Sequence, residues 1–245
     1  MIPKSVLAVF LVVTLTGART QPAPSAREPI ISRGPRAWAL ATTALLAYYN
    51  RDRIDMLSPN VRNDSNVAET RGILHDWWGI DNRSDLLQSL EFLERGGHRL
   101  EFQKLGQSLM AMTNARYKAL ISAERSHPYQ ARRMNLTREH FREHRDNSLV
   151  AWDYSRYIML CRWGYMVGFL TEEEAWHRIM PAARTMQSSF RSWMELGEDY
   201  LVGREFWSRE QMDRNGRIYR DIEKWLRKEP RSPWNQLPWQ MDLGP

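Results

Sequence analysis

The chain has 245 residues, of which 42% are apolar and 26% charged, and its net charge is +6. These proportions are those of a globular protein that can bury a sizeable core. Cys161 is the only cysteine, which excludes an internal disulfide. The composition is unusual in its 11 tryptophans and in a positive charge carried almost entirely by arginine.

The N-terminus has the pattern of a secretory signal peptide. Lys4 supplies a positive charge, residues 6–15 form a short apolar run, and small residues follow at 16–18. The run is too short for a membrane-spanning helix, which needs about 20 apolar residues. No cysteine follows it, as a lipoprotein would require. We expect residues 1–20 to be removed, leaving a periplasmic or secreted protein. The alternative is an uncleaved N-terminal membrane anchor.

Residues 21–36, rich in Pro, Ser and Arg, are predicted to be a disordered linker. Beyond them the apolar spacing is helical and no window alternates with period two. The pattern predicts an all-α fold, a single Trp-rich domain over 37–229 with about seven to nine helices in an irregular orthogonal array. An irregular Pro/Trp tail over 230–245 follows. Helices are predicted over 37–49, 67–78, 85–95, 98–126, 149–170, from 171 onward, over 189–201 and over 208–228.

Local signals mark several ends of these helices. Thr171 with Glu174 three residues later is a capping box, which predicts a helix start. Gly79 and the Gly96–Gly97 pair predict helix ends. Trp234 and Trp239 are expected to hold the C-terminal tail against the body.

The most distinctive stretch is 151–207, which contains five tryptophans. Its motif AWDxxRxxxLxRWGYxxGFLxxxEAW, followed by SFRSW and YLxGRxFW, resembles the bacterial domain of unknown function 1266. The upstream segment WWGIDNRSDLLQSLEFLERGGH is similar to that family's N-terminal motif. The resemblance covers about 74–207 and implies a helical fold with no established activity. The matching positions are Trp78, Ile80, Trp152, Asp153, Arg156, Gly164, Gly168, Glu174, Ala175, Trp176, Ser192, Trp193, Gly203, Arg204 and Trp207.

Asp153 and Arg156 lie three residues apart on one face of an otherwise apolar helix. Charges buried together must pair, because desolvation is otherwise prohibitive. We favour a structural interpretation, a buried ion pair that fixes helix register and is reinforced by Arg204 or Glu174. The functional interpretation is a polar pocket floored by Asp153, in which Arg156 and Arg204 bind an anionic group. The aromatic residues expected to line it are Trp78, Trp152, Trp193 and Trp207.

Two further patterns carry weaker signals. His140, Glu143 and His144 match the H-x-x-E-H spacing of a zinc-protease motif. No third ligand can be named, so we predict neither a metal nor a cofactor. The segment 116–145 holds eight cations against three glutamates, a pattern that can bind nucleic acid or anionic lipid. Without a nucleic-acid motif we expect a solvated face and no nucleic-acid partner.

The resulting functional hypothesis is a non-enzymatic envelope interaction or binding protein, whose partner is a protein or an envelope component. Membrane contact is expected only through an uncleaved N-terminus. One alternative is a hydrolase or transferase that acts on an anionic envelope substrate through Asp153, Arg156 and Arg204. Another is a toxin-associated or immunity protein. The first alternative requires those three side chains to meet in an open cleft.

Overall fold

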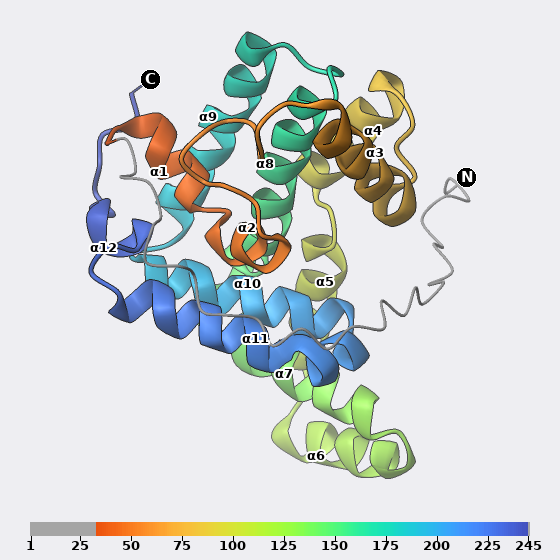
Figure 1. Cartoon of the computed structure of the whole chain (residues 1–245). Helices are drawn as coiled ribbons and strands as arrows, with labels where there is room; N and C mark the ends of the chain where they lie inside the picture. Colours follow the sequence, from red (N-terminus) through yellow and green to blue (C-terminus); the bar gives the residue numbers. More distant parts are fainter. Residues whose placement is uncertain (1–32, 245) are drawn as a thin grey trace.

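The computed structural model describes residues 33–244, which contain α-helices and no strand (Figure 1). The predicted all-α fold is therefore confirmed for this part of the chain. The predicted signal peptide and most of the predicted linker lie outside the described residues. The helices are α1 (Pro35–Ala41), α2 (Ala44–Asn50), α3 (Asp64–Trp78), α4 (Arg83–Arg95), α5 (Arg99–Met110), α6 (Asn114–Ala123), α7 (Pro128–His144), α8 (Val150–Met166), α9 (Glu172–Ser189), α10 (Trp193–Trp207), α11 (Arg209–Lys228) and α12 (Pro233–Gln236).

Helix α8 is the centre of the fold, with α9, α10 and α4 packed around it (Figure 1). Of its 17 residues all but two are buried. A helix that carries apolar residues on every side belongs inside a protein, because no face of it is polar enough to favour water. The predicted helix over 149–170 is thus confirmed, with its ends at Val150 and Met166.

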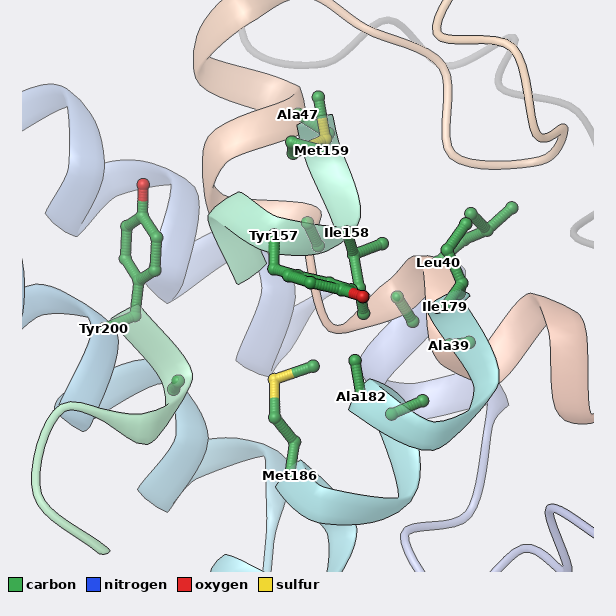
Figure 2. Close-up of a cluster of buried hydrophobic side chains, with 14 of the residues drawn as sticks. Ala39, Leu40, Ala47, Tyr157, Ile158, Met159, Ile179, Ala182, Met186 and Tyr200 are labelled. Atoms are coloured by element: carbon green, nitrogen blue, oxygen red, sulfur yellow. The ribbon is translucent and has the colours of Figure 1, made fainter. Parts of the chain in front are cut away.

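The apolar core between α8, α9 and α1 is shown in Figure 2. Tyr157 and Ile158 of α8 lie beside Ile179 and Met186 of α9, and Leu40 of α1 closes the cluster. Each of these side chains is at most 3% exposed. Full burial of a side chain of this size stabilises the fold by roughly 1.5 to 3 kcal/mol.

A second cluster, built from tryptophans, holds the C-terminal tail. The Trp193 ring lies 4.7 Å from that of Trp38, 5.0 Å from that of Trp239 and 6.1 Å from that of Trp234. The Trp239 indole donates to the carbonyl of Phe190, and the Trp234 indole donates to a carbonyl of α1. Buried indole N–H groups need such partners. The expected attachment of the tail by Trp234 and Trp239 is confirmed.

Glycines let α8 approach its neighbours closely. At Gly203 of α10 a Cβ atom would overlap the Trp152 side chain, and at Gly164 it would overlap Leu86 of α4. Glycine inside a helix is less stable than alanine by about 0.5 to 1 kcal/mol. These two glycines are therefore explained by the short distance between helices.

The predicted helix over 98–126 is wrong, because the segment forms two helices. Helix α5 ends at Met110, and Thr113 has an extended backbone with φ −63° and ψ 154°. The Thr113 hydroxyl accepts from the backbone N–H of Arg116 at 3.3 Å, so it caps a new helix. Helix α6 contains no buried residue and projects from the body together with the start of α7 (Figure 1).

Other boundaries also differ from the prediction. The segment 37–49 is divided between α1 and α2, where the Thr42 and Thr43 hydroxyls bond back to carbonyls three residues earlier. The motif of His140, Glu143 and His144 lies at the end of α7, a 17-residue helix that the sequence analysis did not predict and that begins with Pro128 at its first position. The helix predicted over 189–201 begins after Ser192 and continues to Trp207. These divisions, with short helices such as α12, raise the number of helices among the described residues to 12.

Candidate functional site

Asp153 is completely buried, and both of its carboxylate oxygens are occupied. Oδ1 accepts from the backbone N–H of His98 at 3.2 Å and from Arg156 Nη2 at 2.7 Å. Oδ2 accepts from the backbone N–H of Arg99 at 3.0 Å and from Arg99 Nη1 at 3.2 Å. An ionised carboxylate only accepts hydrogen bonds, so four charge-assisted bonds leave Asp153 well satisfied.

The two backbone donors begin helix α5, whose first N–H groups have no partner within the helix. Asp153 of α8 supplies the acceptor that an N-cap side chain would supply locally. We call this arrangement a tertiary cap: a carboxylate on one helix that accepts from backbone N–H groups at the start of another. Gly97 makes it possible, since a Cβ there would overlap the Asp153 carboxylate and its φ is +48°.

Arg156 completes this site from the same helical face. It is 6% exposed. Its Nη2 donates to Asp153 and to Nδ1 of His98, the latter at 2.8 Å. Its guanidinium lies 4.1 Å from the ring of Trp152 and 5.5 Å from that of Trp78. Burial raises the pKa of Asp153, but the neighbouring His98 ring, the Arg156 charge and the backbone N–H of Arg99 outweigh it and hold that pKa below its ordinary value.

A second tertiary cap, which the sequence analysis missed, begins α8 itself. Asp199 of α10 is fully buried and accepts from the backbone N–H groups of Leu149 at 2.6 Å and Ala151 at 2.8 Å. His140 of α7 donates to it through Nε2 at 2.7 Å. Leu149, which donates the shorter of these two bonds, has φ +63°. Asp199 thus joins α7, α8 and α10.

His140 therefore forms a hydrogen bond with the carboxylate of Asp199, so it is not part of an isolated pair with His144. The two imidazole rings lie 4.3 Å apart. Burial and the neighbouring His140 lower the pKa of His144. No group of three or more His, Cys, Asp or Glu side chains that could hold a metal ion occurs among residues 33–244.

Arg162 is a second buried charge, after Asp199, that the sequence analysis missed. It donates to the backbone carbonyls of Arg53, Leu57 and Met56, and so holds the loop between α2 and α3. Burial lowers its pKa to about 10, although nearby Asp52 opposes the change. Burial also raises the pKa of Asp52 to about 6, against the opposing charge of Arg162.

Glu174 and Arg204 are the other two residues predicted to belong to the Asp153–Arg156 site. Their hydrogen-bond partners lie elsewhere. Glu174 forms the predicted capping box with Thr171 and an ion pair with Arg83 of α4 at 2.6 Å. Arg204 is 7% exposed and donates to Gln211 Oε1 at 3.0 Å.

Of the four aromatic residues predicted to line this site, three lie near Arg156 or Trp152 and one lies elsewhere. Trp78 and Trp152 flank Arg156, and the Trp207 ring lies 5.9 Å from that of Trp152. Trp193 belongs to the tryptophan cluster at the tail. Three of the four rings therefore lie beside Arg156 or beside Trp152, and the fourth does not.

The basic segment 116–145 forms most of the projection. Two of its arginines pair with the body, Arg132 with Glu205 at 2.7 Å and Arg133 with Glu101 at 2.5 Å. The two cations of α6, Arg116 and Lys118, are exposed. No helix among the described residues has the length and apolar character needed to cross a bilayer.

Comparison with known proteins places this architecture in a family. The model for "Protein of unknown function (DUF1266)" matches residues 73–239. Uncharacterized protein YbeU of Escherichia coli (strain K12) is 30% identical over 56% of this chain, and uncharacterized protein YbeR of the same organism is 26% identical over 56%. The chain spans just over half the length of these relatives, 58% and 57%. No solved structure matches it. The chain belongs to the DUF1266 family.

Proposed function

We propose that this protein is an exported, non-enzymatic binding protein that recognises a protein partner through the turn between α4 and α5. The observation that carries the proposal is the use of Asp153. The Asp153 carboxylate accepts hydrogen bonds from the backbone of this turn on the core side. On the solvent side the turn presents the apolar side chains of Phe92 and Leu100. We call this surface the turn face and define it by Phe92, His98 and Leu100.

The turn face has the composition of a recognition surface. Phe92 is 41% exposed and Leu100 is 45% exposed. The His98 ring packs edge-on against Phe92, with 5.6 Å between ring centroids. Leu100 lies over Gly96, where a Cβ would overlap it. Aromatic side chains are enriched at the centres of protein interfaces and supply much of the binding energy there.

The backbone beneath the turn face is fixed on both sides. Arg99 donates to the carbonyls of Leu93 and Glu94 at 2.6 and 2.7 Å, which satisfies the C-terminal end of α4. Asp153 satisfies the N-terminal end of α5. A surface held in one conformation loses little entropy when a partner binds, so it binds more tightly than a mobile one.

The enzyme alternative receives less support from the same geometry. It requires Asp153, Arg156 and Arg204 in an open cleft, and their exposed fractions are 0%, 6% and 7%. None of the three lines either of two shallow surface depressions, one beside α9 and one on α11. A carboxylate with four hydrogen bonds is also a poor general base, since its lone pairs are occupied.

The binding proposal is tested by capture of partners from an envelope extract with the mature protein. We expect a specific partner to be retained by wild type and lost at least about tenfold in Phe92→Ser/Leu100→Ser, because interface anchors are worth more than 1 kcal/mol each. Met194→Ser on α10 is the matched control, because Met194 is 43% exposed and lies outside the turn face. Equal retention by wild type and the double variant, both folded by circular dichroism, would contradict the proposal.

The export part of the proposal rests on Lys4 and the apolar run 6–15. Cell fractionation with N-terminal sequencing should find a chain shortened by about 18 to 20 residues outside the cytoplasm. Full-length protein confined to the cytosol would refute export without affecting the turn face.

A further inference from the structure

Four buried donors without protein partners gather in one part of the core. Among the described residues, five buried side-chain polar atoms have no hydrogen-bond partner. Four of them are Trp152 Nε1, Tyr200 Oη, Arg204 Nε and Tyr219 Oη. Buried polar groups in folded proteins are nearly always bonded, so four such atoms in one place require an explanation.

The four side chains form a continuous cluster where α8, α10 and α11 meet. The guanidinium of Arg204 lies 4.4 Å from the ring centroid of Tyr219. The Tyr219 and Tyr200 centroids are 6.2 Å apart, and those of Tyr200 and Trp152 are 5.3 Å apart. Figure 2 shows the Tyr200 hydroxyl pointing away from the apolar side chains of α9. We call this cluster the Arg204 site.

Positive charge exceeds negative charge around the Arg204 site. Arg204 forms no ion pair within the described residues, and its hydrogen-bond acceptor is the neutral Gln211. The charge of Arg204 adds to burial in lowering the pKa of Arg156, which shows that the two guanidinium groups act on each other. Asp153 neutralises Arg156 and at the same time pairs with Arg99. A buried cation without a counter-ion is strongly unfavourable.

Each of the four polar atoms can donate a hydrogen bond at physiological pH, and the two tyrosine hydroxyls, which lie close enough to interact with each other, can also accept one. Burial raises the pKa of Tyr200 to about 12 and that of Tyr219 well above its ordinary value, so both hydroxyls keep their protons. Indole Nε1 and guanidinium Nε can only donate. Several donors around a guanidinium match an oxyanion, and the positive charge of Arg204 disfavours a metal cation.

We infer that Arg204, Tyr200, Tyr219 and Trp152 bind a small oxyanion that carries a carboxylate or phosphate group. The anion would accept hydrogen bonds from Arg204 Nε and the two hydroxyls and would neutralise Arg204. The Arg204 site involves none of the residues of the turn face, so this inference goes beyond the proposed function and does not depend on it.

The test uses the purified mature protein after exchange into a buffer in which chloride is the only anion added. Thermal unfolding is followed with increasing sodium phosphate or, separately, sodium acetate, at constant ionic strength. We expect a saturable rise in the melting temperature with one of them, since a ligand of the folded state stabilises it. The anion that produces the rise distinguishes a phosphate from a carboxylate ligand. Absence of a saturable rise with both would mean that water serves the donors, and it would overturn the inference.

Variants assign the response to the Arg204 site. Gln211→Glu places a carboxylate beside Arg204, so we expect a higher melting temperature without added anion and no further rise with it. Tyr219→Phe removes a donor that has no protein partner, so folding is retained while anion affinity falls roughly fivefold. Tyr154→Phe is the matched control and should respond like wild type. An anion response unchanged in both Gln211→Glu and Tyr219→Phe would also overturn the inference.

Discussion

Replacement of Asp153 by alanine is expected to destabilise the whole domain. The substitution removes four hydrogen bonds at once: two to the backbone at the start of α5, one to Arg156 and one to Arg99. It also leaves Arg156, which is 6% exposed, without its carboxylate. Removal of one partner from a buried ion pair costs about 3 to 5 kcal/mol, and loss of a helix cap costs typically about 1 kcal/mol.

These values are large against the roughly 5 to 15 kcal/mol that stabilises a domain. For a domain of this size, each kcal/mol corresponds to about 2 to 4 °C in melting temperature, so a loss of 3 to 5 kcal/mol predicts a decrease of about 6 to 20 °C. The assay is thermal unfolding followed by circular dichroism. Asp153→Asn should lose less, because an amide keeps one acceptor oxygen and the shape of the side chain.

Asp76→Ala is the control, because Asp76 is exposed on α3 and should change the free energy of unfolding by at most about 0.5 kcal/mol. A folded Asp153→Ala protein that melts within about 2 °C of wild type would refute the structural interpretation of the pair. A variant more stable than wild type would favour the pocket interpretation, since functional sites often store destabilising polar groups.

Three further predictions concern packing, pH and the thiol. Gly203→Ala should destabilise by about 1 to 3 kcal/mol because its Cβ overlaps Trp152, whereas Gly72→Ala, which meets nothing within 4 Å, should stabilise by about 0.5 to 1 kcal/mol in urea unfolding. Burial raises the pKa of Asp52 from 3.8 to about 6, so the folded state holds the extra proton and the free energy of unfolding falls as pH rises through that interval. Asp52→Asn should remove up to about 3 kcal/mol of this decline in urea titrations at pH 4 and pH 7, and an unchanged decline would exclude Asp52 as its source. Burial raises the pKa of Cys161, which is 0% exposed, so a thiol reagent should label it only at the rate of unfolding; immediate labelling of native protein would contradict its burial.

The fold class and most helices were predictable because they depend on local signals. Apolar spacing, the Thr171 capping box and the Gly79 helix end all operate within a few residues. The helix breaks at Thr42 and Thr113 were missed because threonine marks a break only when its hydroxyl bonds to nearby backbone. Pro128 was a usable signal for the start of α7, since proline fits the first position of a helix.

The candidate site was predictable only in part. A charge within an apolar helix correctly indicated the buried pair of Asp153 and Arg156, and the same signal at Arg162 was available. Asp199 gave no such signal, because it follows Glu198 in a mixed sequence and its role depends on where α8 begins in space. That Arg204 meets the neutral Gln211, with no ion pair among the described residues, likewise depends on how α10 packs against α11.

The two tertiary caps have a consequence for the order in which the chain can complete its structure during synthesis. The cap of α5 is Asp153, which is synthesised 54 residues after Arg99, and the cap of α8 is Asp199, which is synthesised 50 residues after Leu149. At about 5 to 20 residues per second, the ribosome takes roughly 2.5 to 11 s to synthesise the intervening chain up to each carboxylate. A nascent chain that ends before residue 199 therefore has its central helix without its cap. We expect the N-terminal half of the protein to complete its folding only after the C-terminal half has been synthesised, because both caps come from later residues.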